Sequence, residues 1–127
     1  MNFKKQLGLL LGACLPLLLQ PTLSFAGDVN IVDVKASKDG GGTWTFDVTL
    51  EHEDSGWEHY ADAWRVIGID DKIYGTRTLF HPHETEQPFT RSQSGIKIPD
   101  NVDTVYVEAH DKVHGWSPDK YKYKLPK

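Results

Sequence analysis

One segment of the sequence alternates strictly between apolar and polar side chains. From Trp44 to Leu50 every second residue is large and apolar, and Thr45, Asp47 and Thr49 lie between them. A period of two places the two sets on opposite faces of a β-strand. The apolar face requires a second layer to cover it, as in a half-buried antiparallel strand. His52 continues the apolar phase just past this run, and we expect it to cap the core there rather than to bind a ligand.

Six further segments have the composition of short strands. They span residues 29–36, 63–69, 73–80, 89–98, 104–109 and 121–125. Turn residues such as Gly40–Gly42, Asp70–Asp71 and Pro99–Asn101 separate several of them, and no segment has a helical period of 3.6. Seven short strands in about 100 residues predict an all-β, antiparallel two-sheet Greek-key sandwich of the immunoglobulin or fibronectin type III kind. A partly open β-barrel is the alternative.

The first 26 residues have the features of a cleaved signal peptide. Lys4 and Lys5 precede the apolar run Leu7–Leu19, and the small residues of Ser24–Ala26 suit cleavage after Ala26. The sequence therefore predicts one exported domain, residues 27–127, that is periplasmic or secreted and has no transmembrane segment after cleavage. Cys14 follows a run that resembles the segment before the lipidated cysteine of a lipoprotein. The alternative to a periplasmic or secreted domain is therefore a lipoprotein that is attached to lipid through Cys14.

The charge and the sulfur content of residues 27–127 exclude several classes of partner. Cleavage removes two lysines and leaves 12 basic against 18 acidic residues, a net charge of −6. This charge argues against binding to nucleic acid or to anionic lipid. The chain's single cysteine and single methionine both lie in the leader. The exported domain therefore has no disulfide and no sulfur ligand for Cu(I).

All the histidines fall in or beside three polar connections. Because successive antiparallel strands alternate in direction, connections 53–60, 81–88 and 111–119 are expected at one end of the sandwich, and short turns at the other. The six histidines are His52, His59, His81, His83, His110 and His114. Loops at one end of a sandwich are a common place for a binding site, so this asymmetry is the main functional signal.

The first functional hypothesis is a metal site. Imidazole ligands suit Cu(II) and Zn(II), and a site needs three or four ligands that converge from separate loops. We expect the ligands to be His81, His83, His110 and His114. Further ligands, or partners that orient the ligands, are His59, Glu84, Glu86 and Asp111. The competing interpretation is that these side chains are solvated and that Glu84 and Glu86 form surface ion pairs with Arg91 or Arg77.

The second functional hypothesis is a recognition surface for a protein or glycan partner in the cell envelope. Trp57, Tyr60 and Trp116 lie in the same connections, and aromatic side chains among polar neighbours are typical of such surfaces. Alternatively, Trp57 or Trp116 folds back and closes the end of the sandwich. We predict no enzymatic activity, because the chain has no nucleophile elbow and no phosphate-binding loop. A His/Glu acid–base pair is the remaining catalytic alternative.

Three stretches of the sequence resemble those of a small family of uncharacterised secreted bacterial β-sandwich proteins. They are Gly56–Trp64, the segment from His81-Pro82-His83 to Arg91, and the segment from Ala109-His110-Asp111 to Gly115. The resemblance covers most of residues 27–127. It implies an exported single domain, and because that family has no assigned activity, it implies no mechanism.

Overall fold

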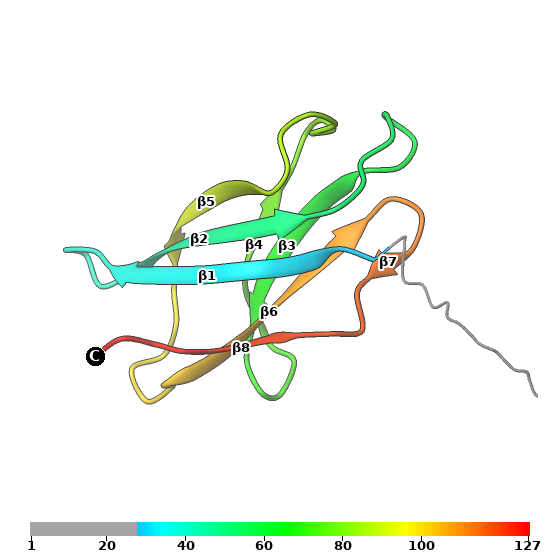
Figure 1. The fold of residues 1–127 in the computed structure, drawn as a ribbon. Coiled ribbons are helices and arrows are strands. Elements are labelled where there is room, and N and C mark those ends of the chain that lie inside the picture. The colour runs from blue at the N-terminus through cyan, green and yellow to red at the C-terminus, as the bar shows by residue number, and fades with distance from the viewer. Residues whose placement is uncertain (1–27) are drawn as a thin grey trace, which may run out of the picture.

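The computed structural model describes residues 28–127, which form two antiparallel β-sheets and no helix (Figure 1). The signal peptide predicted for residues 1–26 lies outside the described residues. The strands are β1 (Asn30–Lys38), β2 (Trp44–Glu51), β3 (Ala61–Ile67), β4 (Ile73–Thr78), β5 (Phe89–Ile96), β6 (Thr104–Asp111), β7 (Gly115–Trp116) and β8 (Tyr121–Lys124).

The two sheets form a sandwich and do not close into a barrel. One sheet has the order β1-β2-β5, and the other has the order β4-β3-β6, with β7 and β8 both paired to β6. The prediction of a two-sheet antiparallel sandwich is therefore confirmed, and each of the seven predicted segments overlaps a strand. The structure adds the short strand β7 inside the expected loop 111–119. It arises because His110 pairs with Trp116 before the chain leaves the sheet and returns as β8.

The alternating face of β2 forms the centre of the core. Trp44, Phe46, Val48 and Leu50 are each no more than 4% exposed. The facing sheet contributes buried side chains from β3 and β6: Trp64, Val66, Val105, Val107 and Ala109. Burial of apolar side chains on both inner faces is the main stabilising contribution in such a sandwich.

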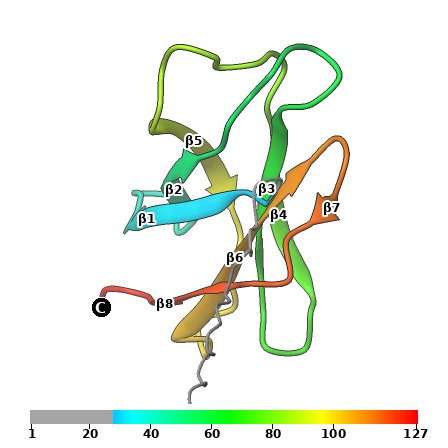
Figure 2. The same cartoon turned by 45° about the vertical axis from the view of Figure 1, so that its right-hand side comes forward.

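The connections divide between the two ends of the sandwich, as the topology predicted. Two long connections, residues 52–60 and 79–88, and the short β6–β7 turn, residues 112–114, lie together at what we call the loop end (Figures 1 and 2). Hydrogen bonds join them: Asp54 accepts from the backbone N–H of His83, and the N–H of Lys112 donates to the carbonyl of Tyr60. The loop end is therefore a packed unit. Residues 28–127 contain no helix that is long and apolar enough to span a membrane.

Candidate metal centre

His52 lies at the centre of a buried polar cluster at the loop end. It is the first residue after β2 and keeps the phase of the buried face, so its ring points inward and is only 1% exposed. Its Nδ1 lies 2.6 Å from Oδ1 of Asp54, whose side chain is fully buried. A carboxylate at this distance accepts a hydrogen bond from Nδ1 and orients the ring, so that Nε2 faces Asp111.

Asp111, the last residue of β6, provides the carboxylate that faces Nε2 of His52. Its Oδ1 accepts hydrogen bonds from the backbone N–H groups of Val113 and His114, at 2.8 and 2.6 Å, which shape the tight β6–β7 turn. Burial acts to raise the pKa of the Asp111 carboxyl. The hydrogen bonds from His114 and Val113 more than offset this effect, so the pKa lies below its usual value. Asp111 is therefore a buried anion that two backbone groups hold in place.

The side chains of His52 and His59, from the β2–β3 connection, converge with that of Asp111 at the end of β6. Nε2 of His52 lies 3.3 Å from one Asp111 oxygen, and Nε2 of His59 lies 3.7 Å from the other. One potential ligand atom from each residue falls within 4.8 Å of the other two. Ligands about 2.0–2.1 Å from a tetrahedral ion are about 3.3 Å apart. The 3.3 Å contact between His52 and Asp111 matches this spacing, and the 3.7 Å contact of His59 with the other Asp111 oxygen is somewhat longer.

Two further observations favour a cation at this cluster. Nε2 of His59 is buried and has no hydrogen-bond partner among residues 28–127, although it points towards Asp111. His114 borders the cluster on its solvent side: its ring centroid is 5.1 Å from that of His59, and its Nδ1 is 3.1 Å from Asp111. The His114 side chain is 43% exposed and lies outside the three residues whose potential ligand atoms fall within 4.8 Å of one another.

His81 and His83, two of the four predicted ligands, lie together in the β4–β5 connection, with ring centroids 4.8 Å apart. Arg91 donates to Nε2 of His83 at 2.9 Å, and the His83 ring stacks on Phe89. That arginine already uses the lone pair with which His83 would bind a metal. Nδ1 of His83 is buried without a hydrogen-bond partner in the described chain and lies 3.9 Å from Asp54.

His110, the third predicted ligand, is engaged elsewhere. Its Nδ1 contacts a carboxylate oxygen of Asp62, and its ring lies edge-on to Trp116. The Arg65 guanidinium covers the indole of Trp116 at 3.7 Å and also pairs with Glu108. His110 thus belongs to a different group of residues from the His81/His83 pair. Of the four predicted ligands, His114 contacts Asp111, and His83 borders the cluster only through Asp54.

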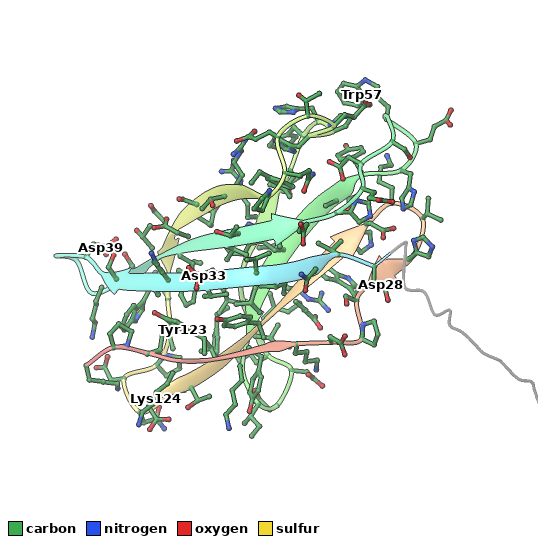
Figure 3. The ribbon with its side chains drawn as sticks, in the orientation of Figure 1. Asp28, Asp33, Asp39, Trp57, Tyr123 and Lys124 are labelled. Atoms are coloured by element: carbon green, nitrogen blue, oxygen red, sulfur yellow. The ribbon has the colours of Figure 1, made fainter. Side chains whose placement is uncertain are left out.

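The remaining predicted site residues are dispersed over the loop end. Glu86 forms an ion pair with Arg91 at 3.1 Å, which lowers the pKa of Glu86, whereas Glu84 is exposed beside Gly56. Tyr60 is 7% exposed and packs edge-on against Trp57, which is 65% exposed. Tyr60 therefore helps to close this end of the sandwich, whereas Trp57 lies at the outer tip of the loop end (Figure 3). Trp57 remains the exposed aromatic side chain of the predicted recognition surface.

Sequence reasoning missed two central residues of the cluster, His52 and Asp54. The expectation that His52 only caps the core is incomplete, because its ring has a carboxylate at each nitrogen. The signal was present in the alternation of β2: an imidazole in phase with a buried face needs buried partners, since buried polar groups are nearly always hydrogen-bonded. Asp54 lies only two residues further along the chain.

The buried imidazole of His83 predicts a specific dependence of stability on pH. Burial, and next the charge of Arg91, lower the pKa of His83 below its ordinary value of 6.5. The unfolded chain therefore binds this proton more readily than the folded chain, so His83 destabilises the fold increasingly as the pH falls below 6.5. Urea unfolding in EDTA between pH 7.5 and pH 5 should give a smaller loss of stability for His83→Gln than for the wild type. An equal loss in both proteins would contradict this assignment, and His81→Gln is the matched control.

Comparison with known proteins gives one informative relative. A protein of Halomicrobium mukohataei named "Putative lipoprotein" is 42% identical over 89 residues, which cover 70% of this chain and 43% of that protein. The matched region is thus less than half the length of that relative. No family model matches the chain, and no solved structure matches it significantly.

Proposed function

We propose that the protein is an exported, non-enzymatic metal-binding domain. Its site is formed by His52, His59 and Asp111, and His114 completes it at the solvent side. The observation that carries the proposal is the convergence of two imidazole nitrogens on one buried carboxylate at 3.3 and 3.7 Å. Cu(II) and Zn(II) suit this set of nitrogen and oxygen ligands, and two imidazoles with one carboxylate also suit Fe(II).

We further propose that the protein is located in the cell envelope. The first 26 residues have the composition of an export leader, and the name of the Halomicrobium relative supports the variant in which Cys14 carries lipid. A site built from imidazoles and a carboxylate contains no thiol that an oxidising compartment could convert to a disulfide. Residues 27–127 contain no cysteine.

The test is a metal titration of the purified protein after treatment with EDTA. We expect isothermal titration with ZnCl₂ and CuSO₄, and with Fe(II) under anaerobic conditions, to detect one ion per chain at micromolar affinity or tighter for at least one metal. His59→Ala should weaken binding by more than about 100-fold, because it removes a ligand rather than an outer partner. His81→Ala is the matched control and should bind as the wild type does. Absence of binding for all three ions, or unchanged binding by His59→Ala, would refute the proposal.

A second function is favoured by one observation, the 65% exposure of Trp57 at the tip of the β2–β3 connection. An exposed indole at the loop end suits a protein or glycan partner in the envelope. Under this alternative, the His/Asp cluster is a buried ion-pair network that only holds the loops together. Trp57→Ala would then abolish partner binding, and metal would have no effect on it.

A further inference from the structure

Gln87, in the β4–β5 connection, holds the backbone of His52. Its Oε1 accepts a hydrogen bond from the His52 backbone N–H at 3.0 Å, and its Nε2 donates to the carbonyl of His83 at 2.9 Å. One amide side chain thus joins the residue proposed as a metal ligand to a loop that is distant in sequence. The β4–β5 connection contributes none of the three converging ligand atoms.

Asp54 holds the ring of the same histidine and is bound to the same loop. Its Oδ1 faces Nδ1 of His52 and accepts from the N–H of Ala61, and its Oδ2 accepts from the N–H of His83 at 2.7 Å. His52 is therefore held twice, at its backbone through Gln87 and at its ring through Asp54. Both paths end on the backbone of His83.

His83 is itself fixed to β5. Its ring lies parallel to that of Phe89 at a centroid distance of 4.0 Å, and Arg91 bonds to its Nε2 while pairing with Glu86. These contacts connect the inner edge of the β4–β5 connection to a strand of the sandwich. A displacement of this loop would move His83 and, through it, both groups that orient His52.

We propose that the β4–β5 connection, residues 79–88, controls the metal affinity of the site, with Gln87 and Asp54 as positioning residues for His52. This inference rests on the proposed function. Outer partners that orient a histidine ligand typically contribute 10–100-fold to metal affinity. Because coupling between two sites is reciprocal, a bound metal must in turn stabilise the position of this loop.

The experiment compares Gln87→Met with the wild type. Methionine keeps the length of the side chain but makes neither hydrogen bond, so we expect metal affinity to fall by about 10–100-fold. If Cu(II) binds, its electron paramagnetic resonance spectrum should also change, since His52 loses its orientation. A purely structural role of Gln87 would change the stability of the metal-free protein but not this spectrum. Glu84→Gln, an exposed position on the same loop, is the matched control and should behave as the wild type does.

Hydrogen exchange measures the reverse coupling. Metal should slow exchange of the His52 and His83 amide hydrogens in the wild type, and should slow it less in Gln87→Met. If the wild type binds metal and Gln87→Met has the same affinity, spectrum and exchange, the inference is overturned while the metal site stands. If the wild type binds no metal, the proposed function and the inference both fail.

Discussion

Replacement of Asp54 by alanine is expected to lower the free energy of unfolding by about 3–5 kcal/mol in the metal-free protein. The Asp54 side chain is fully buried and accepts from the His52 ring and from the backbone N–H groups of Ala61 and His83. Alanine would leave these donors without an acceptor in a site that water does not reach, and each orphaned donor costs about 1–3 kcal/mol. Urea denaturation in EDTA, followed by tryptophan fluorescence, measures the loss.

Asp54→Asn tests how much of the loss comes from the negative charge, and Glu58→Ala is a control at an exposed position. Asp54→Asn keeps one acceptor oxygen but loses the negative charge beside His52, so its loss of stability should be smaller than that of Asp54→Ala. Glu58→Ala removes an exposed carboxylate from the same connection and should change stability by less than about 0.5 kcal/mol. If Asp54→Ala were as mild as Glu58→Ala, Asp54 would not be the anchor of the loop end.

Replacement of Trp64 by alanine is expected to cost about 3–5 kcal/mol, through loss of packing in the core. Trp64 lies on β3 with no exposed surface and is the largest of the fully buried side chains described. Trp64→Phe should cost much less, because it retains an aromatic ring. It also removes an indole Nε1 that is buried without a hydrogen-bond partner in the described chain. The midpoints of thermal unfolding measure both effects, at about 4–8 °C for each kcal/mol in a domain of this size.

Trp57→Ala provides the matched control for this second prediction. The same substitution at a side chain that is 65% exposed removes little buried surface, so the midpoint should shift by only a few degrees at most. Equal decreases in the unfolding midpoint for Trp57→Ala and Trp64→Ala would contradict the assignment of Trp64 to the buried core and of Trp57 to the exposed surface.

The metal hypothesis was in part accessible from the pattern of residues. The count of antiparallel strands placed the three polar connections at one end, and His59, Asp111 and His114 were all named as candidates. The choice of His81, His83 and His110 as ligands rested on local composition, which does not show which groups an imidazole ring contacts. Arg91 and Asp62 are the partners that engage His83 and His110, and both contacts join residues that are separated along the chain.

The sequence by itself determined the layered fold, because a period of two in β2 and short strands between turns allow few arrangements other than two packed sheets. It also determined that the histidines gather at one end, since that follows from strand direction alone. Only the tertiary structure decided which histidines meet. The His52 ring lies between Asp54 and Asp111, 57 residues apart in sequence, because β3 pairs with β6 and brings Ala61 opposite Asp111. Contacts of this kind depend on the register between strands, which no local pattern of residues encodes.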